Sequence, residues 1–434
     1  MKTPALSENH FWRYFNFIAL YLAQGIPEGM LAYGIPAWMA MNGKTPGQIG
    51  AFVAAVILPW SFKLLVAPLM DRFTYLPMGR RRPWVLLGQM GLVCAFIFLA
   101  FVPDPLNNLT TFMLAGFTVG CFGAFQDVAT DGMAVDIVPE EQQAKANGFM
   151  WGAKILGTSA SLAVGSYMLG HYDYRTAILV LALAVGIIML VPLFLRERPG
   201  EKFLPWTKGG ASVATQNMQL GNWKVIFKSL FSVFSLQTSL LVALLLFVSQ
   251  FSFSIVSTSL PIFTVQALGW TDQLYAQFFA TASLIGGFSG MIIGGMAIDK
   301  FGKKKMMGIY YLLLIVLTVS FVLLKSYWTS KWVIIGFMCF YQILFVFSSI
   351  GIFALAMRIC WKKVSASQFT IFMTIGNLGR ISGAKSIGEL KAYIPWEYAF
   401  LLFCCIILLS GFLLRYVHMK RQIAEIEKLE QAFH

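Results

Sequence analysis

Acidic side chains occur inside apolar segments of this chain, where a charge is costly. The stretch FGAFQDVATDGMAVD contains Asp127 and Asp131, four residues apart, so both lie on one face of a helix. A charge at the centre of a bilayer costs on the order of 3 kcal/mol or more, and it normally faces a partner or a wet cavity. Because carboxylates so placed can bind and release protons, we interpret Asp127 and Asp131 as proton-coupling residues.

Lysines on neighbouring segments are candidate charge-pair partners. At about 1.5 Å per residue along a helix, Asp127 matches Lys154 in depth and Asp131 matches Lys63. We therefore expect the ion pairs Asp127–Lys154 and Asp131–Lys63, whereas Asp136 lies near the helix end, where water can solvate it. The pairs either hold the helices together or release a carboxylate that then takes up a proton, and the sequence leaves both alternatives open.

Glu28 is a third candidate for proton coupling. It lies in YLAQGIPEGMLAYG, where Gly25, Pro27 and Gly29 interrupt the first apolar run. Proline removes a backbone donor, and irregular backbone at membrane depth is tolerated only where protein or a cavity covers it. The depth argument places Glu28 too far from Lys63 to pair with it. We expect either an acid without a partner, poised to bind a proton, or a kink that contains a hydrogen-bonded carboxylic acid.

The composition indicates how these residues are positioned. The chain has 434 residues, of which 58% are hydrophobic and 12% charged, and its mean hydropathy is +0.71. Soluble domains are about a quarter charged, so we predict an all-α membrane protein. Apolar runs of about 20 residues predict about twelve transmembrane helices in two six-helix bundles, at residues 12–40, 48–70, 84–103, 109–137, 144–170, 174–195, 237–265, 272–297, 306–324, 332–357, 366–389 and 396–416.

The formal net charge of +14 reflects topology. Most Lys and Arg residues fall in alternate loops, which the positive-inside rule assigns to the cytoplasm together with both termini. We therefore expect the lipid bilayer, and no nucleic acid, as a partner. The cysteines fall in or near the apolar runs and the histidines lie at segment ends, so we expect no metal site and no cofactor.

The segments PLMDRFTYLPMGRRRPW and GGMAIDKFGKKKMM form an internal repeat, which is typical of transporters built from two bundles. We expect bundles at residues 1–196 and 231–418, a cytoplasmic linker at 197–230 that can hold an interfacial helix, and a cytoplasmic tail at 419–434. The repeat gives four candidate gating residues, which either anchor the loops through salt bridges or form latches that open in one state: Asp71, Arg72, Asp299 and Lys300.

Polar side chains in the second half predict contacts with a solute. Arg380 has no acid within its own half, and arginine binds carboxylate or phosphate groups in a bidentate manner. Amides and hydroxyls also bridge membrane helices, so each position has a structural alternative. With Arg380, the candidate substrate-binding residues are Gln126, Gln250, Ser254, Tyr341, Gln342 and Asn377.

The repeat resembles the loop signature of the major facilitator superfamily. Two strings are similar to its AmpG-like branch: Lys63, Ala67, Pro68, Asp71 and Arg72, and Gln126, Asp127 and Asp131. This branch contains muropeptide permeases, siderophore importers and the acetyl-CoA transporter. The resemblance implies a monomeric, proton-coupled importer of a large polar or anionic solute such as a muropeptide, working by alternating access in the bacterial inner membrane. A siderophore importer and an acyl-CoA carrier are the alternatives.

Two other classes fit less well. A membrane-embedded enzyme needs a nucleophile–base pair or metal ligands at membrane depth, and all four histidines are peripheral. A non-transporting sensor is expected to carry a long soluble domain, whereas the linker and the tail of this chain are short. We therefore predict that the protein is not an enzyme.

Overall fold

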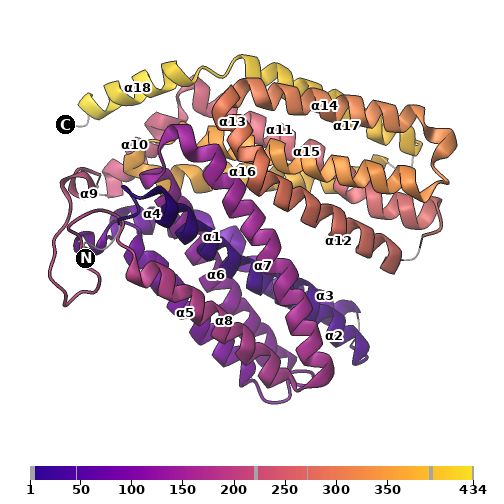
Figure 1. The fold of residues 1–434 in the computed structure, drawn as a ribbon, viewed down its shortest axis with the longest axis horizontal. Coiled ribbons are helices and arrows are strands. Elements are labelled where there is room, and N and C mark those ends of the chain that lie inside the picture. The colour runs from indigo at the N-terminus through magenta and orange to yellow at the C-terminus, as the bar shows by residue number, and fades with distance from the viewer. Residues whose placement is uncertain (1–4, 45, 219–222, 271, 391–393, 433–434) are drawn as a thin grey trace. The chain divides into compact units, whose positions relative to one another are not determined.

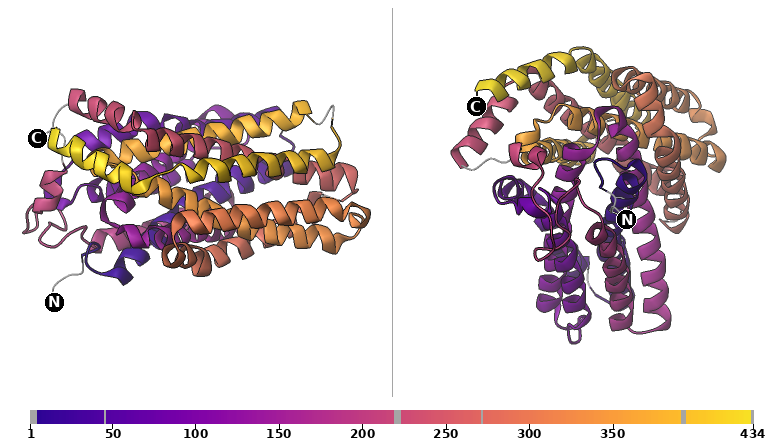
Figure 2. Two further views of the ribbon diagram at one scale, coloured as in Figure 1. Left: turned by 90° about the horizontal axis from the view of Figure 1, so that it is seen from above. Right: turned by 60° about the vertical axis from the view of Figure 1, so that its left-hand side comes forward.

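The computed structural model describes residues 5–44, 46–218, 223–270, 272–390 and 394–432, and the described part is helical without a named strand (Figures 1 and 2). The first half contains α1 (His10–Pro27), η1 (Glu28–Gly34), α2 (Ile35–Met41), α3 (Pro46–Ile57), η2 (Leu58–Phe62), α4 (Lys63–Arg72), η3 (Leu76–Met78), α5 (Arg82–Ala100), α6 (Leu109–Ile137), η4 (Glu140–Gln142), α7 (Gln143–His171) and α8 (Tyr174–Phe194).

The linker and the second half continue the pattern. They contain α9 (Val213–Asn217), α10 (Trp223–Phe234), α11 (Gln237–Ile262), η5 (Phe263–Ala267), α12 (Asp272–Ser289), η6 (Gly290–Gly294), α13 (Gly295–Phe301), α14 (Lys303–Leu323), η7 (Lys325–Tyr327), α15 (Lys331–Arg358), η8 (Lys362–Val364), α16 (Ser365–Leu390), α17 (Trp396–Arg415) and α18 (Met419–Ala432).

In the described part of the chain, eight helical segments are long and apolar enough to cross a membrane. They are α5, α6, α8, α11, Gln277–Phe301 (in α12 to α13), α14, α15 and α17. The other four expected spans correspond to α1–η1–α2, α3–η2–α4, α7 and α16. The first two are interrupted at Pro27 and Pro59, as expected where proline removes a backbone donor. The predicted all-α membrane fold is confirmed.

The chain divides into two compact units. Unit 1 comprises Met1–Pro139, Phe149–Phe227 and Lys362–Thr370, and unit 2 comprises Glu140–Gly148, Lys228–Trp361 and Ile371–His434. The first residues of α7 therefore belong to unit 2, and the first residues of α16 belong to unit 1. Each unit thus contains a short helix start from the opposite half of the sequence.

Each unit has its own apolar core. In unit 1, α5 packs on α6 and α8, and the buried side chains include Phe96, Phe112 and Leu181. In unit 2, α11, α14, α15 and α17 pack together around an aromatic cluster in which the rings of Phe321 and Phe337 stack at 4.1 Å. Burial of such large apolar side chains is the main favourable contribution to folding within each unit.

Helix α10 follows the linker and is amphipathic. Ile226, Leu230 and Val233 are buried on one side, whereas Phe227 and Phe231 are exposed on the other. This pattern is typical of a helix that lies along an interface. Trp223, at its start, packs edge to face against Phe73.

Candidate functional site

Glycines in the interrupted first span set the position of Glu28. A Cβ atom on Gly25 would collide with the backbone of Lys154 and Thr158, and one on Gly29 would collide with Thr158. Only glycine allows α1 and α7 to approach this closely. The close packing brings the Glu28 carboxylate to 3.0 Å from the Lys154 ammonium, and the two side chains are 38% and 18% exposed.

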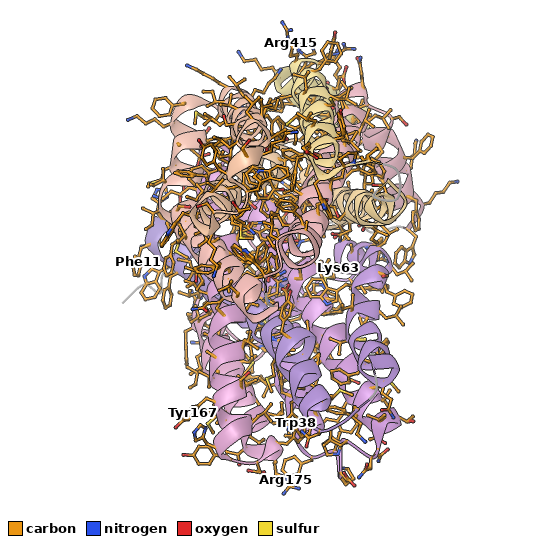
Figure 3. The ribbon with its side chains drawn as sticks, turned by 90° about the vertical axis from the view of Figure 1, so that its right-hand side faces the viewer. Phe11, Trp38, Lys63, Tyr167, Arg175 and Arg415 are labelled. Carbon is orange, nitrogen blue, oxygen red and sulfur yellow. The ribbon has the colours of Figure 1, made fainter. Side chains whose placement is uncertain are left out.

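A short 3-10 segment, η2, interrupts the second span and positions Lys63. Pro59 lies in this segment, and α4 begins at Lys63. Figure 3 shows Lys63 away from the end of unit 1 where Trp38 and Arg175 lie. The Lys63 ammonium donates to Asp127 on α6, and both side chains of this pair are about one-tenth exposed or less (10% and 8%).

The two aspartates of α6 share one face and receive further donors from α1. The amide of Gln24 donates to Asp127, and the hydroxyl of Tyr21 donates to Asp131. Both aspartates are buried. Among the described residues, no lysine or arginine nitrogen lies within ion-pair distance of Asp131. Lys63 therefore pairs with only one of the two buried carboxylates on this face.

The predicted ion pairs Asp127–Lys154 and Asp131–Lys63 were wrong, although both lysines do bond intramembrane acids. Lys63 bonds Asp127 rather than Asp131, and Lys154 bonds Glu28, which we had expected to lack a partner. Rise along a helix gives depth, but it does not give the direction in which a side chain points. The breaks at Pro27 and Pro59 also change the rise locally, so a uniform 1.5 Å per residue does not hold there.

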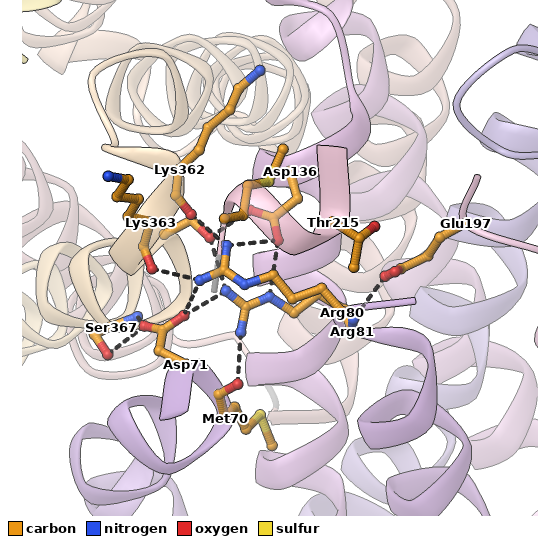
Figure 4. A network of polar contacts seen from close by, with 12 residues as sticks. Met70, Asp71, Arg80, Arg81, Asp136, Glu197, Thr215, Lys362, Lys363 and Ser367 are labelled. Carbon is orange, nitrogen blue, oxygen red and sulfur yellow. Dashed lines mark hydrogen bonds and ion pairs between the residues drawn. The ribbon is translucent and has the colours of Figure 1, made fainter. Parts of the chain in front are cut away.

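A second buried network lies where α4 ends and α5 begins (Figure 4). Asp71 is fully buried and accepts hydrogen bonds from Arg80 and Arg81. It also accepts from the backbone N–H of Ser367 at 3.0 Å and from its hydroxyl at 2.7 Å. Because Ser367 lies in the first turn of α16, the carboxylate caps that helix and complements its dipole.

Asp136 completes this network from α6. Its carboxylate accepts from Arg81 at 3.0 Å and Arg80 at 3.3 Å, and from the Ser365 hydroxyl at 2.5 Å. The expectation that Asp136 is solvated was therefore wrong, because the two arginines cover it. Arg72 is not the partner of Asp71, and its guanidinium lies 5.2 Å from the centroid of the Phe73 ring.

The repeat in unit 2 forms a smaller arrangement. Asp299 accepts from the backbone N–H groups of Lys145 at 2.8 Å and Ala144 at 3.3 Å, in the first turn of α7. The Lys303 ammonium lies 3.8 Å from Asp299. Lys300 is exposed, with its ammonium 5.5 Å from the Phe301 ring centroid.

The segment after α8 carries two further acids. Glu197 is fully buried and accepts from the backbone N–H groups of Arg81 and Arg82 at 2.8 and 3.1 Å. Glu201 accepts from the Thr215 hydroxyl at 2.8 Å. Burial, aided by repulsion from Glu201, raises the pKa of Glu197 to about 7. Burial also raises the pKa of Glu201.

The candidate substrate residues are distributed unevenly. Gln126 is fully buried, and its amide donates to the Leu20 carbonyl and the Thr130 hydroxyl. Asn377 and Arg380 are exposed on α16. A Cβ atom on Gly376 would lie 3.4 Å from the Gln250 side chain, so Gln250 packs beside the helix that carries them.

The remaining candidates in unit 2 are more enclosed. Ser254 lies against Gly383 of α16, whereas Gln342 lies against Gly286 of α12. Tyr341 is 2% exposed, and its hydroxyl donates to the Phe253 carbonyl at 3.3 Å. Ser254 is thus beside the helix of Asn377 and Arg380, whereas Gln342 packs on α12. Within the described residues, no three His, Cys, Asp or Glu side chains are grouped to hold a metal ion.

Several site residues escaped the sequence analysis. Tyr21 and Gln24 precede the candidate Glu28 at spacings of three and four and share one helix face with it, which is a signal that would have found these two residues. Arg80 and Arg81 were treated only as part of a basic triplet. Glu197 had no local signal that it is buried, because the backbone groups that donate hydrogen bonds to it lie more than a hundred residues away in the sequence.

The chain is similar to known membrane transporters. It is 29% identical over 175 residues to an uncharacterized protein of Haemophilus influenzae, a match that covers 40% of this chain and only 41% of that relative. It is 24% identical over 422 residues to the anhydromuropeptide permease of Escherichia coli, covering 96% of this chain and 81% of the permease.

Solved structures show the same fold. The crystal structure of FucP, a major facilitator superfamily transporter in the outward conformation, superposes with a TM-score of 0.70 at 12% identity, covering 94% of this chain and 98% of FucP. The family model described as Major Facilitator Superfamily matches residues 17–384. The repeated aspartate motifs, the interrupted membrane helices and these matches agree, and the chain belongs to the major facilitator superfamily of membrane transporters.

Proposed function

We propose that this protein is a proton-coupled importer of a muropeptide or a similarly large, polar, anionic solute. Family membership makes it an integral membrane transporter. The similarity to an anhydromuropeptide permease over almost the whole chain supports the choice of solute. In this proposal the protein works as a monomer in the bacterial inner membrane. Its bundles at 1–196 and 231–418 alternate access, and both termini, the linker and the tail face the cytoplasm.

The charge balance at the buried face of α6 carries the proposal. Lys63, Asp127 and Asp131 are all at most about one-tenth exposed, and they include two acids but one base. A buried carboxylate without a cation is costly, and one bound proton removes the excess charge. We assign that proton to Asp131, because Lys63 bonds Asp127 and only the neutral Tyr21 donates to Asp131.

We propose that the more exposed pair, Glu28–Lys154, breaks when the solute binds. Lys154 can bind an anionic group of the solute in place of Glu28, and the released Glu28 then becomes a second proton acceptor. Arg380 and Asn377, exposed on α16 beside Gln250 and Ser254, are the proposed solute contacts in unit 2. Asp71 and Asp299 each cap a helix, and we propose that these capping hydrogen bonds break and re-form during the cycle.

Uptake into energised membrane vesicles tests the proposal. A labelled anhydromuropeptide is offered with and without a protonophore, and Asp131→Asn is compared with the wild type. We expect the protonophore and the substitution each to reduce accumulation at least about tenfold, because a charge-neutral Asn cannot carry the proton. Solute exchange without a proton gradient is expected to survive in Asp131→Asn, since that step needs no net proton movement.

Other outcomes separate the alternatives. Accumulation of a labelled ferric siderophore or of acetyl-CoA, but not of the anhydromuropeptide, keeps the coupling scheme and changes the solute. Protonophore-insensitive uptake with normal Asp131→Asn activity contradicts proton coupling at this face. Glu28→Gln provides a second check, because we expect it to weaken proton-driven uptake more than exchange. An equal loss of both, with normal expression, would assign Glu28 to solute binding or to holding the structure.

A further inference from the structure

One aromatic side chain lies between the two intramembrane ion pairs. The Lys63 ammonium is 4.0 Å from the centroid of the Trp60 ring, and the Lys154 ammonium is 5.4 Å from it. Both distances are within the range of a cation–π interaction, which extends to about 6 Å. Lys63 belongs to the buried pair with Asp127, and Lys154 belongs to the more exposed pair with Glu28. A single indole therefore contacts a member of each pair.

The backbone of η2 explains how Trp60 reaches this position. In a 3-10 helix, side chains three residues apart lie above one another, and Trp60 is three residues before Lys63, at which α4 begins. The ring also packs on α6, since a Cβ atom on Gly123 would lie 4.0 Å from its edge. Gly123 is one helical turn before Asp127. The break in the second span thus places the indole against the helix that carries both aspartates.

The indole contacts Lys63 and Lys154 directly, and the charged and titratable groups that bond these lysines or lie beside them come from four elements. They are Tyr21 and Glu28 from the first span, Lys63 from α4, Asp127 and Asp131 from α6, and Lys154 from α7. A lysine whose carboxylate takes up a proton, or is displaced by a solute anion, is left as a poorly solvated cation. Such a cation is costly unless another electron-rich group faces it.

We propose that Trp60 is a positioning residue that couples the two ion pairs by holding whichever ammonium has lost its carboxylate. This inference rests on the proposed proton coupling. When the proton held by Asp131 passes to Asp127, four residues away on the same helix face, Lys63 loses its carboxylate, stays charged and is held by the ring. When a solute anion leaves, Lys154 returns over the same ring to Glu28. Both cations contact the Trp60 ring, and Lys154 is also 5.5 Å from the centroid of the Trp151 ring. The state of one pair therefore affects the other through the shared Trp60 ring.

The pH dependence of uptake tests this role. The ring stabilises the ammonium in the proton-bound state, so its removal makes proton binding less favourable. In Trp60→Leu we expect half-maximal uptake to move about 0.5 to 1 pH unit to lower pH, the shift that a buried cation–π contact can supply. Trp60→Phe keeps an aromatic face and is expected to shift by less than half as much. Trp38→Leu is the matched control, because Trp38 stacks on Tyr174 at 5.2 Å in the same unit.

A stability measurement keeps the test independent of transport. The melting temperatures of Glu28→Gln, Asp127→Asn and the double variant are compared with and without Trp60→Leu. We expect the two substitutions to be non-additive when Trp60 is present and nearer to additive when it is replaced. An unchanged pH profile in Trp60→Leu, or non-additivity that persists in full, overturns the proposal. If the wild type shows no proton-driven uptake, the proposed function fails, and the melting cycle alone still decides the role of Trp60.

Discussion

In both copies of the repeat the aspartate caps a helix, but the basic residues that bond the aspartate differ. Asp71 accepts from the backbone of Ser367 and Asp299 accepts from the backbone of Lys145, which are each the third residue of their helices, α16 and α7. The first copy adds two arginines and a second carboxylate, that of Asp136. The second copy adds one lysine at 3.8 Å. The shared feature is therefore a helix cap, and the arginine network is an elaboration of one copy.

The length of the loop accounts for the difference. Both copies contain a glycine with positive φ before the next helix, Gly79 at 100° and Gly302 at 96°. In the second copy the helix begins directly after this glycine, at Lys303. In the first copy η3 lengthens the loop, and α5 begins only at Arg82. Arg80 therefore lies outside the helix and is able to turn back toward Asp71.

The chemistry of the basic residue also differs. A guanidinium has five donors in a rigid fork and can bridge two carboxylates, whereas an ammonium is a compact point charge. Arg81 uses this fork to bond Asp71 and Asp136 at once. We infer that the copy in unit 1 resists disruption more strongly than the copy in unit 2, and four comparisons test this inference.

The largest expected effect is that of Arg81→Lys. Lysine lacks the planar fork by which Arg81 bonds Asp71 and Asp136 at once, so at least one buried charged hydrogen bond is lost although Arg80 still contacts both carboxylates, at a cost of about 3 to 5 kcal/mol. The matched variant in the second copy, Lys303→Gln, is expected to cost about 1 kcal/mol. Thermal unfolding of the purified protein in detergent measures both. Equal losses in the two copies would contradict the inferred difference.

Removing the capping charge is expected to have the next largest effect. Asp71→Asn leaves two buried arginines with one carboxylate between them and should cost about 2 to 4 kcal/mol. Asp299→Asn keeps an oxygen for the Lys145 N–H and should cost about 0.5 to 1 kcal/mol. The same melting assay distinguishes the two variants. A larger loss for Asp299→Asn would show that the cap in unit 2 is the stronger one.

The first copy should also show a pH dependence that comes from Glu197, which accepts hydrogen bonds from the backbone of Arg81 and Arg82. Burial raises the pKa of Glu197 from 4.5 to about 7. Between these values the folded protein binds more protons than the unfolded chain, so stability falls as pH rises through this window and is constant above it. We expect about 1 to 2 kcal/mol of change between pH 5 and 7. Melting curves of Glu197→Gln should lose most of this slope, and an unchanged slope would assign it to other groups.

The smallest difference is expected between the two glycines. Alanine at either position has an unfavourable positive φ, which costs about 1 to 2 kcal/mol. Nothing lies within 4 Å of a Cβ atom at Gly302, whereas a Cβ atom at Gly79 would collide with the Glu197 carboxylate. Gly79→Ala should therefore melt lower than Gly302→Ala. If the two melt alike, the Glu197 side chain has moved aside without loss of stability.

Individual residues show where sequence reasoning succeeded and where it failed. The equivalence of Asp71 and Asp299 was visible in the sequence because a repeated motif occupies a repeated structural position. Arg72 was a candidate gating residue like Asp71, but the arginines that bond Asp71 are Arg80 and Arg81, because adjacent residues in a helix point in different directions. Glu28 and Lys154 were each found as candidates, but their contact depends on the close approach of α1 and α7 at Gly25 and Gly29.

The sequence by itself determined the membrane-spanning helices, since long apolar runs have no other stable environment. It also determined which charged residues lie at membrane depth and that the chain contains a repeat. Only the tertiary structure decided which acid meets which base, how Trp60 comes to contact both Lys63 and Lys154, and why Glu197 is buried. Such contacts depend on the rotation of each helix about its axis and on local breaks in the backbone. Packing between distant segments sets both, and no local pattern encodes them.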